Sequence, residues 1–157
     1  MLFHRNLSML FRTHVAVGIF FIIVFLPLVN HKLLFSGVVL LCSLLPDIDM
    51  SSSFLGKYKF LRPLQWVVKH RGIFHSFTFA IFFSILFAFY YPILALPFFL
   101  GYSAHLIADS LTVEGIKPFW PHEHEIKWKI RTGGKKKKMI FYTLMLVNVI
   151  LFIKYLT

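Results

Sequence analysis

Two pairs of ionisable side chains close apolar stretches of this sequence, where charged groups are rare unless they have a function. Asp47 and Asp49 follow Pro46, after which an extended backbone would place both carboxylates on one side. His105 and Asp109 are four residues apart, so on a helix they share a face and can reach one metal ion. Imidazole and carboxylate donors suit zinc, and also manganese or iron.

Three more histidines extend this set of donors. His14 opens the first apolar stretch, while His70 and His75 flank Gly72 at the start of the third, and this glycine lets the backbone turn. Four imidazoles and three carboxylates are enough donors for one or two metal ions. The predicted ligands are His14, Asp47, Asp49, His70, His75, His105 and Asp109. Each pair also has a structural interpretation, as a solvated turn at the two early aspartates or a hydrogen bond between His105 and Asp109.

The composition places these donors in a membrane protein. Of 157 residues, 58% are hydrophobic. The chain also contains 17 Lys and Arg but only 6 Asp and Glu, which gives a net charge of +11. So much apolar surface excludes a disordered basic tail and argues against a soluble nucleic-acid binder, because a globule this small could not bury it. Nucleic acid is therefore not an expected partner. The single cysteine, Cys42, excludes an intrachain disulfide.

Five apolar stretches organise the chain, at 15–29, 33–45, 73–91, 92–108 and 139–153. Each approaches or reaches the length of a membrane span, although the second is short. We expect an all-α polytopic helical bundle of about five spans that forms one membrane-embedded domain, 1–157. Within it, 13–121 would be the metal-binding core, 122–138 a basic amphipathic segment and 139–156 the C-terminal span. The sequence does not indicate an oligomeric state.

The basic residues predict how the bundle is oriented in the cell (inner or plasma) membrane. With five spans, every Lys and Arg except Lys32 and Lys154 falls on the side of the N-terminus. The positive-inside rule makes that side cytoplasmic and the C-terminus external. The first stretch has no small-residue cleavage pattern after it, so we expect it to be retained rather than removed as a signal peptide. All six acidic residues also fall on the cytoplasmic side.

The basic segment before the last span has a pattern of its own. Residues 126–131 alternate apolar and cationic side chains, and 132–134 form a turn signal. These features predict a small cytoplasmic amphipathic β-hairpin or loop at the interface. The four lysines at 135–138 would hold it against anionic lipid headgroups.

The donor residues occur within motifs that resemble a known family. The motifs are Leu44-Leu45-Pro46-Asp47-Ile48-Asp49, His70-Arg71-Gly72 with His75-Ser76, Gly101-Tyr102 with His105 and Asp109, and Trp120-Pro121. In this order they resemble the YdjM family of membrane-bound metal-dependent hydrolases. That family is grouped distantly with zinc-dependent phospholipase C and single-strand nucleases, which are helical and cleave phosphodiesters with clustered zinc ions. The resemblance implies metal ligands at the same seven positions. Met50 departs from it, since many members have a histidine there.

Residues and resemblance together predict a membrane-bound metal-dependent hydrolase that cleaves a phosphoester of a phospholipid or lipid-linked phosphate at the cytoplasmic face. One or two divalent ions, zinc first, would activate water. One aspartate of the pair Asp47 and Asp49, or Asp109, would act as base, and Arg71 would bind a phosphate oxygen. The alternatives are a metal-ion transporter or sensor and a non-catalytic adaptor. Glu114 is a further candidate ligand or base, whereas the His and Glu run at 122–125 is expected to be solvated.

Overall fold

The computed structural model describes residues 2–53, 55–68, 71–130 and 135–157, and within these ranges the regular structure is helical. The α-helices are α1 (Leu2–Phe25), α2 (Lys32–Cys42), α3 (Arg62–Val67), α4 (Phe77–Tyr90), α5 (Pro92–Ser110) and α6 (Lys135–Leu156). Four 3-10 turns connect them: η1 (Leu26–Leu28), η2 (Leu45–Asp49), η3 (Lys59–Leu61) and η4 (Ile73–His75). The predicted all-α class is therefore confirmed.

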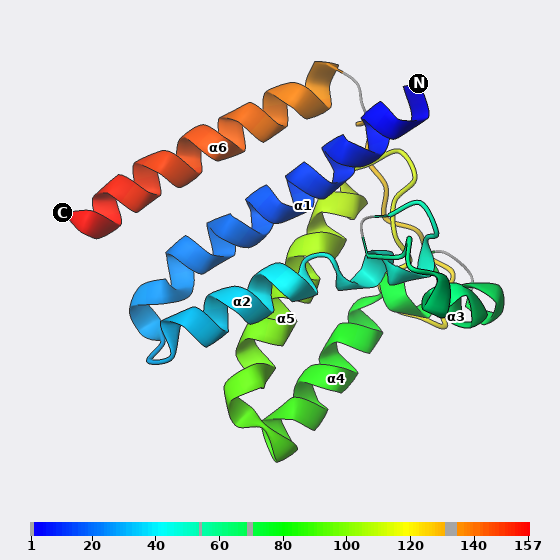
Figure 1. The fold of residues 1–157 in the computed structure, drawn as a ribbon, viewed down its shortest axis with the longest axis horizontal. Helices are drawn as coiled ribbons and strands as arrows, with labels where there is room; N and C mark the ends of the chain where they lie inside the picture. The colour runs from blue at the N-terminus through cyan, green and yellow to red at the C-terminus, as the bar shows by residue number, and fades with distance from the viewer. Residues whose placement is uncertain (1, 54, 69–70, 131–134) are drawn as a thin grey trace.

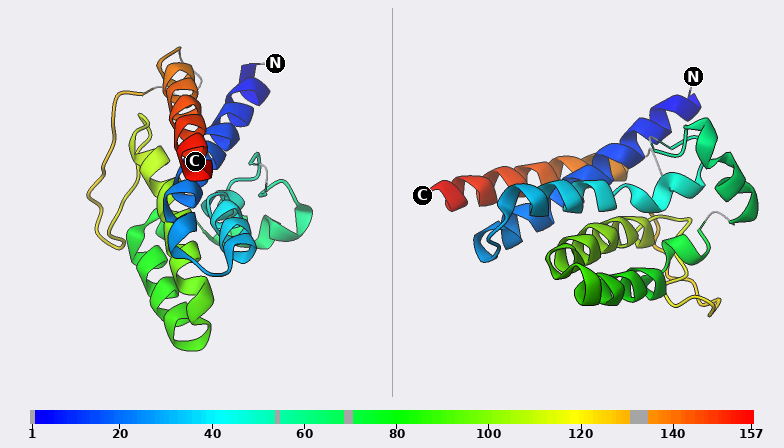
Figure 2. Two further views of the ribbon diagram at one scale, coloured as in Figure 1. Left: turned by 90° about the vertical axis from the view of Figure 1, so that its left-hand side faces the viewer. Right: turned by 60° about the horizontal axis from the view of Figure 1, so that its bottom comes forward.

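The long helices run between two ends of the molecule (Figure 1). The start of α1, the end of α2, the start of α4 and the end of α5 meet at one end, together with α3 and the loop after α5. The turn between α1 and α2, the turn between α4 and α5, and the C-terminus lie toward the other, as the tilted view in Figure 2 also shows. The segments that the basic residues assigned to one membrane side thus share one end of the structure.

Three helices are long and apolar enough to cross a membrane, namely those containing Phe11–Leu28, Pro92–Ser110 and Lys138–Leu156. Helices α2 and α4 have 11 and 14 residues, fewer than the roughly 17 that a span requires. The five-span arrangement therefore stays a prediction. Helix α6 exposes most of its apolar side chains, as expected for a helix surrounded by lipid.

The loop 111–130 contains no strand, so the predicted hairpin is not confirmed. Two isolated bridges hold this loop, one between Thr112 and Ile130 and one between Ile116 and Ile126. The alternating segment therefore pairs with the chain that directly follows α5. The predicted turn at 132–134 lies outside the described residues.

Gly101 permits the close packing of α5 on α2 that positions the predicted ligands. A Cβ atom built there would meet the Val39 carbonyl oxygen and lie 2.8 Å from Cβ of Cys42. Only glycine lets two helix backbones approach this closely. The contact brings the C-terminal end of α2 against the turn of α5 that carries His105.

A polar contact joins the last helix to the first. The Asn148 side chain is buried, and its Nδ2 donates a hydrogen bond of 2.9 Å to the Ala16 carbonyl oxygen in α1. Such side-chain bonds fix neighbouring helices within a lipid environment. Helix α6 therefore packs along α1, beside the core formed by α2, α4 and α5 (Figure 2).

Replacing Gly101 by alanine should push α5 away from α2. Overpacking of this kind destabilises a protein by about 1–3 kcal/mol, so Gly101→Ala should lower the midpoint of thermal unfolding in detergent. Gly37→Ala is the matched control, because a Cβ at Gly37 meets no atom within 4 Å. The control should be neutral or stabilising by about 0.5–1 kcal/mol. Equal midpoints for the two variants would contradict the close approach.

Candidate metal centre

Six of the seven predicted ligands come together at one end of the bundle. His14 is on α1, Asp47 and Asp49 are on η2, His75 is on η4, and His105 and Asp109 are on α5. The seventh, His70, lies outside the described residues. All six are buried except Asp47, whose side chain is 20% exposed. Segments far apart in sequence thus build one polar cluster within an apolar fold.

The two predicted ligands on α5 lie on one face of the helix, as their spacing predicts. Nε2 of His105 is 3.5 Å from Oδ2 of Asp109, one helical turn later. His14 stacks on His105 with ring centroids 4.0 Å apart, and its Nε2 lies 3.5 Å from Oδ1 of Asp109. Helix α1 therefore adds its imidazole to the same face of α5.

The Asp47 and Asp49 segment differs from the prediction. It forms the 3-10 turn η2 rather than extended chain, because Pro46 near the start of that turn fixes a helical φ. Residues two apart on such a turn point in different directions. Accordingly, Asp47 lies 3.8 Å from Nε2 of His75, while Asp49 lies 3.4 Å from its Nδ1. The two carboxylates bracket one imidazole from opposite sides.

The His105 ring is oriented by the backbone. Its Nδ1 lies 2.9 Å from the Ser43 carbonyl oxygen just after α2, which can only accept, so Nδ1 carries the proton. Nε2 then holds the lone pair and faces the cluster. Within the described residues, neither Nε2 of His105 nor Oδ1 of Asp109 has a hydrogen-bond partner. A buried acceptor left in this way fits a bound cation.

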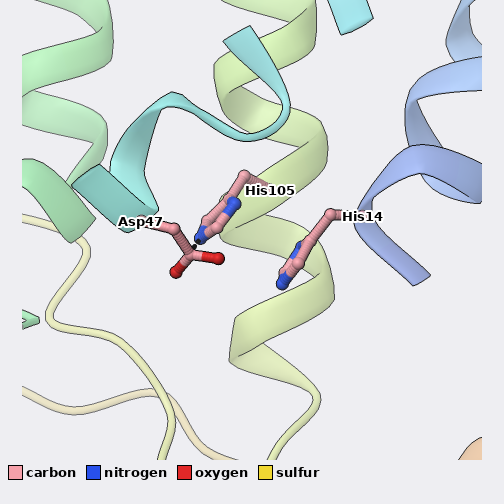
Figure 3. A group of neighbouring side chains, drawn as sticks. All are labelled: His14, Asp47 and His105. Carbon is pink, nitrogen blue, oxygen red and sulfur yellow. Dashed lines mark ion pairs between the residues drawn. The ribbon is translucent and has the colours of Figure 1, made fainter. Parts of the chain in front are cut away.

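Two groups of donors in the cluster could hold a metal ion. One is His14, Asp47 and His105, and the other is His75, His105 and Asp109, with the ligand atoms of each within 4.8 Å of one another. Figure 3 shows the first group, with the two stacked rings beside the Asp47 carboxylate. Donor atoms about 2.0–2.2 Å from one tetrahedral ion are about 3.3–3.6 Å apart. The 3.5–3.7 Å separations around His105 are close to that spacing.

The electrostatics of Asp47 also suit a cation. Burial raises the pKa of this carboxyl, but the neighbouring His105 and His75 outweigh burial and lower its pKa to about 2. Asp47 is therefore ionised at neutral pH, the state in which a carboxylate binds metal.

Arg71 lies at the edge of the cluster and makes more contacts than the sequence suggested. Its Nη2 is 3.4 Å from Oδ2 of Asp109 and 3.0 Å from Oε2 of Glu114, and its Nη1 donates to the Gly115 carbonyl. Its φ of 62° is in the left-handed region, which non-glycine residues seldom adopt. Glu114, considered above as a ligand or base, is thus a partner of Arg71 and belongs to neither donor group.

The predicted solvated run at 122–125 is exposed, as expected. Sequence reasoning missed other groups that position the ligands. Gln65 on α3 donates 2.8 Å and 2.7 Å bonds to the carbonyl oxygens of Ile48 and Gly56, which fixes the loop behind η2. The Tyr102 hydroxyl donates to the Phe74 carbonyl, beside His75. Gln65 carries no sequence signal, whereas Gly101-Tyr102 was part of the motif that resembles the family.

Comparison with known proteins assigns the family. The family described as YdjM inner membrane protein matches residues 9–156, nearly the whole chain. The chain belongs to the YdjM family. It is 37% identical over 106 residues to Inner membrane protein YdjM of Escherichia coli (strain K12) and, to the same extent, to that of Shigella flexneri. Each match covers 60% of this chain, and the chain spans about half the length of these relatives. No solved structure matches.

YdjM family membership agrees with the apolar helices, since the relatives are inner membrane proteins. The chain is accordingly a membrane protein whose buried His and Asp groups could hold a metal ion.

Loss of His105 should abolish stoichiometric metal binding, because both donor groups include it. Loss of residues that merely orient a ligand lowers metal affinity about 10- to 100-fold, so His105→Ala should lower it at least as much. The measurement is the metal content of detergent-purified protein after loading with zinc and desalting. His31→Ala, an exposed histidine on the turn between α1 and α2, should keep the parent's content. Equal content in His105→Ala and the parent would rule out this centre.

Proposed function

We propose that this YdjM family protein is a membrane-bound metal-dependent hydrolase that cleaves a phosphoester of a phospholipid or lipid-linked phosphate at the cytoplasmic membrane face. The observation that carries the proposal is the buried cluster, in which Nε2 of His105 faces two carboxylates without a hydrogen bond. Purely structural histidines are normally satisfied by hydrogen bonds.

The donor set suits zinc best, with manganese or iron as alternatives. His14, Asp47, His75, His105 and Asp109 would hold one or two ions, with His105 common to both groups. A bound ion of this kind supplies Lewis acidity and lowers the pKa of water. The fit rests on imidazole nitrogens and carboxylate oxygens that converge from separate elements.

The carboxylates take different roles in this proposal. Asp47 is the most exposed of the three and is ionised, so in this proposal it accepts a proton from water. Asp49 is 5% exposed and lies against Nδ1 of His75, which favours orienting that ring over touching a substrate. Asp109 holds the centre of the cluster through His14, His75 and His105.

Arg71 would bind the phosphate. Its contact with Glu114 is at the surface, where the carboxylate is 61% exposed and the pair contributes little. A phosphate oxygen is a stronger partner for a guanidinium and can replace Glu114. Arg71 would then hold the substrate beside Asp109, with which it already pairs.

Membrane location supports a lipid substrate. The cluster lies at the end of the apolar helices from which the basic loops also emerge, where headgroups of a bilayer would be found (Figure 1). The lysines at 135–138 would attract anionic lipids on the cytoplasmic side.

A metal transporter or sensor would use the same donors. Transport needs polar groups along the whole membrane depth. Among the described side chains, the buried polar and charged groups gather near the cluster, with Asn148 of α6 as an exception. This distribution favours chemistry at one end over a route across the bilayer. A non-catalytic adaptor would bind lipid but would tolerate loss of the cluster.

The hydrolase should release phosphate or a phosphorylated headgroup from lipid vesicles in the presence of zinc. Asp109→Asn keeps the side-chain volume but removes the negative charge that faces both the cluster and Arg71. It should therefore lower the hydrolysis rate at least ~100-fold. His31→Ala is the active control. Thermal unfolding of both variants checks that they are folded. If zinc-loaded parent protein releases nothing from a panel of phospholipids and polyprenyl phosphates, the hydrolase proposal fails.

A further inference from the structure

The six acidic residues of this +11 chain fall into two sets of three. Asp47, Asp49 and Asp109 belong to the histidine cluster. The other three, Glu114, Glu123 and Glu125, all line one cavity of about 460 Å³ beside the cluster. In a chain with 17 Lys and Arg, every acidic side chain therefore either belongs to the cluster or lines the adjoining cavity.

Arg71 connects the cavity to the cluster. It is a lining residue of the cavity, and its guanidinium pairs with Asp109 of the cluster and with Glu114 of the cavity. A phosphate that contacts Arg71 would thus have the cluster on one side and three carboxylates on the other.

Among the described residues, the other two cavity carboxylates each pair with a lysine. Glu123 lies 3.3 Å from Nζ of Lys117, and Glu125 lies 3.1 Å from Nζ of Lys127. The side chains of Glu123 and Glu125 are 87% and 44% exposed, so solvent screens both pairs and another cation can replace the lysines. Trp120 also lines the cavity, and an indole ring is the aromatic group that attracts a cation most strongly.

We infer that this cavity binds the ammonium group of an aminoalkyl phosphate, whose phosphate contacts Arg71. The inference rests on the proposed function in placing the phosphoester at the cluster. An anionic headgroup would suit the basic loops, but the cavity is lined by three carboxylates and by the cations Arg71 and Lys117, while Lys127 pairs with Glu125 at its edge. The substrate class of the hydrolase is accordingly a phosphate ester that carries a primary amine.

The test compares two soluble phosphates of similar size, phosphoethanolamine and glycerol 3-phosphate, binding to zinc-loaded full-length protein in detergent by calorimetry. The parent should bind phosphoethanolamine about 5- to 10-fold more tightly, as expected for contacts with exposed carboxylates. The double variant Glu123→Gln with Glu125→Gln should lose that preference while still binding glycerol 3-phosphate. A nonspecific effect of the added positive charge would instead strengthen both ligands. Equal affinities in the parent, or a preference that survives in the variant, would overturn the inference.

A second arm identifies the source of the ligand and separates the two proposals. Binding to nanodiscs that contain phosphatidylethanolamine is compared with binding to nanodiscs that contain phosphatidylglycerol. A preference for the amine lipid supports a lipid headgroup, whereas a preference limited to soluble phosphoethanolamine supports a free aminoalkyl phosphate. If the amine preference is measured but no ester is cleaved, the cavity assignment holds and the hydrolase proposal fails. If an ester is cleaved but no amine preference is measured, the hydrolase proposal holds and the cavity assignment fails.

Discussion

The bond between Nδ1 of His105 and the Ser43 carbonyl is the contact on which the candidate centre depends. It sets the tautomer of the imidazole shared by both donor groups, and it exists because α2 and α5 approach closely at Gly101. A buried histidine and several carboxylates would be expensive in an apolar bundle unless they compensated one another or bound a cation. The close packing of α2 on α5 thus brings polar side chains together within an apolar fold.

The basic and acidic residues occupy different parts of the structure. The basic residues gather in the loops at one end, where we propose that they hold the protein against the cytoplasmic leaflet. The carboxylates stay close to the buried cluster or line the cavity next to it, and Arg71 pairs with a carboxylate from each set. The net charge of +11 thus conceals six carboxylates that are concentrated at the cluster and in the cavity beside it.

Much of the centre could be predicted from local patterns. Helical periodicity was enough to place His105 and Asp109 on one face of a helix. His14 and His75 could be predicted as members of the same cluster because each lies at the end of an apolar stretch. The 3-10 turn at Asp47 and Asp49 was missed, because the effect of Pro46 on the following chain was interpreted as extension. The partners of Arg71 and the bridges of the loop 111–130 join residues distant in sequence, so no local pattern reveals them. The short α2 and α4 show that apolar length alone overstates helix length.

X-ray absorption at the zinc edge of the loaded protein tests the central claim most directly, because it reports ligand type independently of any substrate. The account predicts only nitrogen and oxygen neighbours at about 2.0–2.2 Å, with the outer-shell scattering typical of imidazole. That imidazole signal should weaken in His75→Ala, because His75 belongs to one of the two donor groups. A sulfur neighbour near about 2.3 Å, or a spectrum of hydrated zinc without imidazole, would contradict the centre described above.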